Sequence, residues 1–201
     1  MIPKVIFRYS WIYDETMKEM MKRKNKKYPS WASILKLKDR LEKAWRKKEK
    51  EIIKEIAKIT NINWKEKYIH CYVVTESLQS FSEPLTLLSY RNDSFRKIDP
   101  LADTLTHELI HRIFASKENF QKSKKAWDYI NKKYKKETWN TRVHVVIHAI
   151  HKHIFLKFFG EKRLKREIEF MSKFKDYKRA WEIVQKEGYQ NIINEFKEKI
   201  K

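Results

Sequence analysis

The 201-residue sequence has little cysteine, glycine or proline: it contains 1 Cys, 2 Gly and 4 Pro. The single cysteine, Cys71, excludes an intramolecular disulfide, and we expect it to be a small buried residue in the apolar stretch Tyr68–Val74. Scarce glycine and proline favour long helices with short connections. No apolar run approaches the roughly 18 residues that cross a membrane, and the first residues lack the apolar core of a secretory signal. These absences predict a soluble, cytoplasmic protein with no membrane partner.

Charge, by contrast, is abundant and unbalanced: 47 Lys and Arg stand against 26 Asp and Glu, a net charge of +21. Such a field attracts nucleic acid non-specifically, and lysines within 22–27, 43–54 and 132–136 would supply the phosphate contacts. The basic stretches are interleaved with Glu, a pattern typical of solvated helix faces. Abundant Lys and Glu is also a trend of proteins from hot environments.

The spacing of apolar residues predicts three strands and eight helical segments. Strands are expected at Lys4–Arg8, Lys67–Thr75 and Pro84–Tyr90, where β-branched and aromatic residues gather. The expected helices are Glu15–Lys24 (capped by Asp14), Trp31–Ile59 (one long helix, or a helical hairpin with a break whose place the sequence does not show), a segment from Asp99-Pro100 to Ser116 or Lys117, Asn119–Tyr134, Trp139–Phe159 (ending at Gly160), Glu161–Phe174, Tyr177–Lys186 and Gln190–Ile200.

His107, Glu108 and His111 form the motif H-E-x-x-H within the helix that is predicted to begin at Asp99. Residues four apart on an α-helix leave one face, one turn apart, so both imidazoles can bind one tetrahedral Zn²⁺ at about 2.0–2.1 Å. Glu108 is placed to take a proton from a metal-bound water. The motif therefore predicts two metal ligands and a general base, and it requires a third ligand from elsewhere in the chain.

Four more histidines stand close together at His144, His148, His151 and His153. On a helix over Trp139–Phe159 the first three form one stripe with apolar flanks, whereas His153 points away and is expected to be exposed. Several imidazoles on a buried face are costly unless they are paired or bind a metal. We predict that the third ligand comes from this stripe, with His148 slightly favoured over His144 and with His151 as the third choice.

The stretch H-E-L-I-H resembles the motif of the zincin metallopeptidases. The order of elements over Tyr68–Phe159 also looks like that of small intracellular gluzincin-like proteins, such as archaeal minigluzincins and SprT-like proteins. The resemblance implies a zinc cofactor, a peptide or protein substrate and a third ligand from a later helix. In gluzincins that ligand is Glu, and a residue four positions later supports the site; by this analogy His144 would be the ligand and His148 its support. The metzincin continuation after His111 is absent.

These expectations combine into an α+β fold that is mostly helical. A small mixed sheet would pack on the H-E-x-x-H helix and on the second histidine-bearing helix, with helical N- and C-terminal extensions. We predict one domain over residues 1–201, divided into a helical N-terminal part (1–66), a catalytic core (67–159) and C-terminal helices (160–201).

The leading hypothesis is a zinc-dependent metallopeptidase with Glu108 as general base. An extended substrate would lie beside the strand Pro84–Tyr90, and Tyr177 or Tyr189 could stabilise the developing oxyanion. Two alternatives stay open. One is a basic DNA-associated SprT-like protease or nucleic-acid-binding protein with a zinc site; the other is an inactive or zymogen-like zincin that acts as an interaction module.

Overall fold

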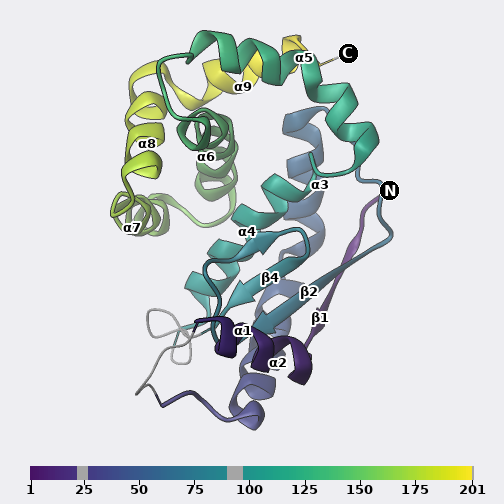
Figure 1. Ribbon diagram of the computed structural model, residues 1–201. Coiled ribbons are helices and arrows are strands. Elements are labelled where there is room, and N and C mark those ends of the chain that lie inside the picture. Colours follow the sequence, from purple (N-terminus) through teal and green to yellow (C-terminus); the bar gives the residue numbers. More distant parts are fainter. Residues whose placement is uncertain (22–26, 90–96, 201) are drawn as a thin grey trace. The chain divides into compact units, whose positions relative to one another are not determined.

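The computed structural model of the chain (Figure 1) describes residues 1–21, 27–89 and 97–200. Three predictions fall partly outside the described residues: the end of the helix Glu15–Lys24, the last residue of the strand Pro84–Tyr90, and all but the last residue of the basic stretch 22–27. The described part is mostly helical with one small mixed sheet, which confirms the predicted α+β class. Within that part, no helix is long and apolar enough to cross a membrane.

The chain divides into two compact units. Unit 1 comprises Met1–Ile53 and Trp64–Arg112, and unit 2 comprises Lys54–Asn63 and Ile113–Lys201. The helix α3 (Glu49–Thr60) contributes residues to both. The single catalytic domain over residues 1–201 stays a prediction.

The sheet of unit 1 has the strand order β1-β2-β4-β3. It consists of β1 (Lys4–Arg8), β2 (Tyr68–Val74), β4 (Leu85–Leu88) and β3 (Phe81–Ser82). The first three run parallel, as their long connections require, and β3 runs antiparallel to β4. The sequence predicted β1, β2 and β4 but missed β3, because two residues are too few to show an alternating pattern.

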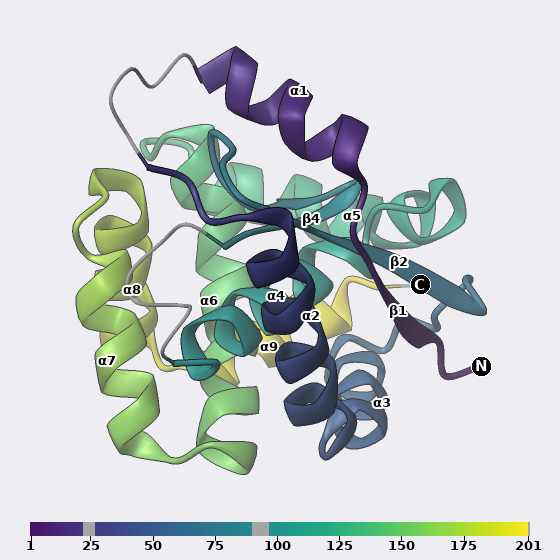
Figure 2. The same cartoon turned by 90° about the horizontal axis from the view of Figure 1, so that it is seen from below.

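Helices cover both faces of this sheet (Figure 2). On one face α1 (Trp11–Met21) packs through Tyr13, whose hydroxyl lies 2.7 Å from Thr86 Oγ1 and whose ring meets Tyr72 edge-on. On the other face lie α2 (Trp31–Arg46) and α4 (Asp99–Arg112). The apolar side chains of this second face form the interior of unit 1: Val5, Phe7, Ile34, Leu37, Leu41, Ile69, Cys71, Val73, Leu85, Leu87, Leu105 and Leu109.

The helix cap predicted at Asp14 was wrong, and of the two alternatives for Trp31–Ile59 the structure has the segment with a break. Asp14 is not a cap: α1 begins at Trp11, and the fully buried Asp14 carboxylate accepts hydrogen bonds from the backbone N–H and hydroxyl of Thr75. The helix predicted over Trp31–Ile59 is broken after Arg46, and α3 follows it. The break lets Arg46 and Glu49 bind the backbone of Val5 on the edge strand β1, through its C=O at 2.8 Å and its N–H at 2.7 Å.

Unit 2 is helical in its described residues, with α6 (Trp139–Phe158) at its centre in Figure 1. Against it pack α5 (Lys117–Lys133), α7 (Glu161–Met171), α8 (Lys175–Glu187) and α9 (Tyr189–Glu198). Ser116 and Thr138 cap α5 and α6 with their side-chain oxygens. Gly160 follows α6 with φ +82° and donates its N–H to the carbonyl of Phe155, as predicted for a helix-ending glycine. The predicted helices of unit 2 are therefore confirmed, with ends that differ by a few residues.

Arg112 fastens the end of α4 to the sheet edge. Its guanidinium donates to the Glu66 carboxylate at 2.5 and 3.0 Å and to the carbonyl of Ser82 at 2.9 Å, and it pairs with Glu83. We expect Arg112→Ala to lower the free energy of unfolding by about 1–3 kcal/mol, because three acceptors lose a charged donor. Urea denaturation measures this loss.

Lys124→Ala is the matched control, since it removes only an exposed pair with Asp128 one helical turn away. Arg112→Lys should fall between the two variants, because a lysine keeps the charge but cannot form the two-pronged contact with Glu66. If Arg112→Ala unfolds at the same urea concentration as Lys124→Ala, the anchoring role of Arg112 is wrong.

Candidate metal centre

The helix α4 holds the motif residues in unit 1. Leu101, Leu105 and Leu109 are buried and fix one side of the helix, and α4 packs against β3, β4 and α2. The same turns carry His107, which is 4% exposed, and Glu108, which is 8% exposed. A helix anchored along its apolar stripe presents these polar side chains in one fixed orientation.

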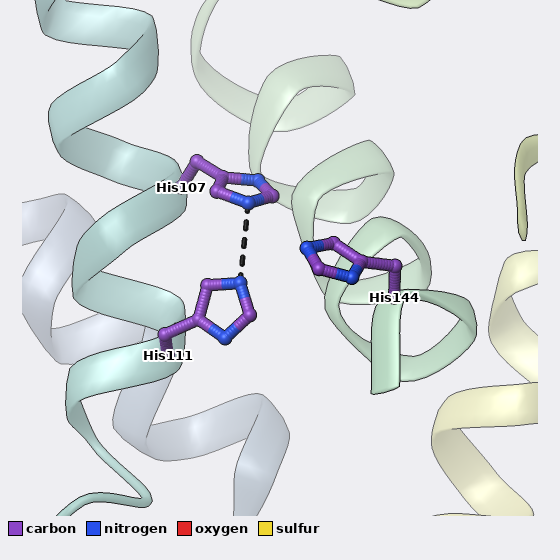
Figure 3. Close-up of side chains that lie close together, drawn as sticks. All are labelled: His107, His111 and His144. Atoms are coloured by element: carbon purple, nitrogen blue, oxygen red, sulfur yellow. Dashed lines mark hydrogen bonds between the residues drawn. The ribbon is translucent and has the colours of Figure 1, made fainter. Parts of the chain in front are cut away.

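His107 and His111 point their rings toward one another from successive turns (Figure 3). Their Nε2 atoms are 3.2 Å apart, and their ring centroids are 4.9 Å apart. Two ligands at 2.0–2.1 Å on a tetrahedral ion are separated by about 3.3 Å. The spacing of the two nitrogens therefore fits one edge of a tetrahedral metal site.

Glu108, the residue after His107, is buried. Burial raises the pKa of its carboxyl to about 8, because an apolar environment disfavours the charged form. Cys71 on β2 is fully buried, as predicted, and burial together with the nearby charge of Glu108 raises the pKa of its thiol. This thiol is consequently neutral and a poor nucleophile.

The histidine stripe of α6 in unit 2 is buried as predicted: His144 is 5% exposed, and His148 and His151 are inaccessible. His153 was expected to be exposed, but this was wrong. It is half-buried, and its Nε2 lies 2.8 Å from Oε1 of Glu55 on α3. A buried carboxylate needs a cationic or donor partner, and His153 provides one.

His144 is oriented by the backbone of its own helix. Its Nδ1 lies 2.8 Å from the carbonyl oxygen of Asn140, which can only accept, so Nδ1 carries the proton and Nε2 carries the lone pair. Burial lowers the pKa of His144 to about 4, although the Asn140 carbonyl and the charge of Asp176 act in the opposite direction. At neutral pH the ring is therefore neutral, which is the form that binds metals.

His148 and His151 have aromatic neighbours instead. The ring of His148 stacks on Trp181 of α8 at 4.4 Å with an interplanar angle of 12°. His151 packs against Phe155 at 4.2 Å, and complete burial lowers its pKa to about 3. His148 thus packs between α6 and α8, and His151 packs within α6 against Phe155 and faces Trp181 of α8 with ring centroids 6.1 Å apart.

We carry His144 forward as the third candidate ligand, in place of the slight sequence-based preference for His148. The hydrogen bond of its Nδ1 to the Asn140 carbonyl leaves the lone pair on Nε2, whereas the ring of His148 stacks on Trp181.

The strand predicted to bind substrate is enclosed within the sheet, and of the two candidate oxyanion residues only Tyr177 contacts His144. The strand Pro84–Tyr90 was expected to face a substrate, but β4 is enclosed by β2 on one side and β3 on the other, and Leu88 N–H is taken by Ser80 Oγ. On the side of β4, the edge strand of the sheet is β3. Tyr177 contacts the ring of His144 at 4.2 Å. Tyr189 packs instead against His153 and Lys152.

The sequence analysis missed the polar residues that surround the start of α6: Thr138, Asn140, Thr141 and Asp176. Thr138 carried a detectable signal, because Thr before a helical pattern is a common N-cap. Asp176 carried none, since its role depends on how α8 packs on α6.

A scan against protein-family models, a search of curated proteins and a search of solved structures each found no match.

The buried His151 makes stability depend on pH. The unfolded chain takes up a proton near pH 6.5, whereas the folded protein resists it down to about pH 3. The stabilising contribution is therefore complete above pH 6.5 and is lost as the pH falls toward 3, by about 1.4 kcal/mol per pH unit. Between pH 6.5 and pH 5 the free energy of unfolding of the metal-free wild type should fall further than that of metal-free His151→Leu. We expect a difference of about 2 kcal/mol between the two decreases.

Urea denaturation in the presence of a chelator, followed by tryptophan fluorescence, measures this difference. His70→Gln is the control, because His70 lies on the exposed face of β2. Equal pH dependence in wild type and His151→Leu would show that His151 does not resist protonation.

Proposed function

We propose that this protein is a zinc-dependent peptidase of the zincin type. The observation that carries the proposal is the geometry of the motif in unit 1, where Nε2 of His107 and Nε2 of His111 are 3.2 Å apart, the spacing of two ligands on one tetrahedral ion. We propose His144 of unit 2 as the third ligand, because its Nδ1 is bonded to the Asn140 carbonyl and its Nε2 carries the lone pair. Glu108, the candidate general base, follows His107 directly in the chain.

The donor set suits zinc in particular. Three neutral imidazoles leave the fourth tetrahedral position for water or substrate, which is the composition of catalytic rather than structural zinc sites. The proton on Nδ1 of His144 fixes the tautomer that leaves Nε2 as donor. When bound there, zinc would lower the pKa of a water molecule toward about 7 and polarise a peptide carbonyl.

Glu108 would act as the general base in this reaction. Its raised pKa reflects burial without a charged partner, and a cation at the histidines would favour the carboxylate form. The carboxylate would accept a proton from the attacking water and donate it to the leaving amine. Its buried position also limits exchange of that proton with bulk solvent.

We infer a peptide or protein as substrate, bound in an extended form. One of the two edge strands of the sheet is β3, directly beside the β4 strand on which α4 packs. An extended chain could add to that edge through main-chain hydrogen bonds. Arg112, which follows His111, binds the carbonyl of Ser82 in β3 and so joins this edge to the motif helix.

The positive charge fits this proposal without a nucleic-acid partner. Many basic side chains are already matched by carboxylates: Arg46 by Glu42 and Glu49, and Lys133 by Glu187 and Glu195. These pairs belong to helix surfaces, which was the expected use of the charge. We further propose a cytoplasmic location, because the chain has a single cysteine and it is buried, so no disulfide contributes to the fold.

The Glu108→Gln variant tests this proposal. We expect the wild-type protein to bind one equivalent of zinc and to cleave an unstructured protein such as casein or a peptide library. Glu108→Gln should keep the zinc but lose at least about 100-fold in turnover, since the amide cannot accept the proton. Metal analysis and a cleavage assay give the two readouts.

Glu118→Gln on α5 is a matched control that makes the same chemical change outside the motif. Turnover by Glu108→Gln at the wild-type rate would rule out the proposed mechanism. A wild-type protein that binds no zinc when supplied with it would rule out the metal site itself.

A further inference from the structure

The first turn of α8 is hydrogen-bonded to the first turn of α6 through one carboxylate. Asp176 Oδ1 accepts from the hydroxyl of Thr138 at 3.0 Å and from that of Thr141 at 3.4 Å, and Oδ2 accepts from the side-chain amide of Asn140 at 3.2 Å. The three donors, Thr138, Asn140 and Thr141, thus belong to the first turn of α6 and its N-cap. A carboxylate can accept all of them, since it has two oxygens with two lone pairs each.

This turn is the one that orients His144. Thr138 is the N-cap of α6, and its Oγ1 also accepts the N–H of Thr141 at 3.1 Å. Asn140, inside the turn, uses its backbone carbonyl to accept the Nδ1 proton of His144 at 2.8 Å. The negative charge of Asp176 also lies at the start of α6, where it interacts favourably with the positive end of the helix dipole. The position of the Asn140 carbonyl is therefore set from two sides, by the cap and by Asp176.

Resting on the proposed function, we propose that Asp176 is a positioning residue for the third ligand. By holding the Asn140 turn it aims the carbonyl at Nδ1 of His144, which keeps the lone pair on Nε2 and the ring in the orientation that binds zinc. Partners that hold a ligand from behind in this way commonly change metal affinity by about 10–100-fold.

Packing from the same helix supports this role. Tyr177, the next residue, meets the ring of His144 at 4.2 Å with an interplanar angle of 71°. The hydrogen bonds of Asp176 thus act at Nδ1 through Asn140, and the ring of Tyr177 acts on the face of the imidazole. Together they restrict both the rotation and the tautomer of His144.

The experiment compares two substitutions on α8. Asp176→Ala removes the carboxylate, and Arg179→Ala is its matched control. Arg179 stands one turn further along α8 and binds Glu137, the residue before Thr138, at 2.7 and 3.0 Å. Both variants break a polar link between α8 and the start of α6, but only Asp176 touches Thr138, Asn140 and Thr141. Asp176→Asn keeps one oxygen and the size of the side chain, so it should be intermediate and should fold if Asp176→Ala does not.

Two readouts separate positioning from general stability. Competition with a chelator measures zinc affinity, which we expect to fall by about 10–100-fold in Asp176→Ala and to stay at the wild-type value in Arg179→Ala. Long-range ¹H–¹⁵N NMR of the metal-free protein at pH 7 reports the His144 tautomer, assigned by loss of its signals in His144→Gln. We expect the Nδ1–H form in wild type and Arg179→Ala, and a mixture of tautomers in Asp176→Ala.

Unchanged zinc affinity and tautomer in Asp176→Ala, or equal losses in Asp176→Ala and Arg179→Ala, would overturn the proposal. Neither readout depends on peptide cleavage, so a protein without peptidase activity would fail the proposed function and still give a result for Asp176. If the wild-type protein bound no zinc, the proposed function would fail at the metal, and the tautomer alone would decide whether Asp176 positions His144.

Discussion

Burial of imidazole rings is the physical constraint on which this structure depends. A histidine that leaves water must remain neutral and must still find partners for its two ring nitrogens. Four histidines are buried in the described residues, on α4 and α6: His107, His144, His148 and His151. Their neighbours follow from this requirement. A ring nitrogen meets another ring nitrogen at the motif, a backbone carbonyl receives Nδ1 of His144, and aromatic faces cover His148 and His151.

Each unit holds its histidines by different means. In unit 1, α4 is fixed by its buried leucines and by Arg112, which joins its last turn to the sheet edge. In unit 2, α6 is fixed by its cap at Thr138 and by the residues of α8 that face it, Asp176, Tyr177 and Trp181. Both histidine-bearing helices are thus held by packed side chains together with hydrogen bonds. Ligands that are held before the metal arrives lose less conformational freedom when they bind it.

Much of this arrangement could be predicted from the sequence because it depends on residues that are close together in the chain. The spacing of His107 and His111, the buried stripe of α6 and three of the four strands each follow from periodicity over a few residues. The contacts that sequence reasoning missed are long-range. Asp14 looks like a helix cap, yet it serves Thr75, 61 residues away. The break after Arg46 allows its guanidinium to bind the Val5 carbonyl on the edge strand β1, and no residue near the break predicts it.

The choice between His144 and His148 shows the same limit. Both lie on the buried face of one helix, so periodicity treats them alike. What separates them is the helix that packs against α6: Trp181 stacks on His148, whereas His144 keeps its hydrogen bond to Asn140. The sequence contains no local sign of where Trp181 packs.

X-ray absorption spectroscopy of the zinc-loaded protein tests the three-histidine site most directly. The account predicts three imidazole nitrogens and one oxygen at about 2.0–2.1 Å in wild type, no sulfur, and two imidazoles in His144→Ala. In His148→Phe, which keeps an aromatic ring against Trp181, the count of three should be unchanged. A spectrum that loses an imidazole in His148→Phe but not in His144→Ala would contradict the assignment of the third ligand.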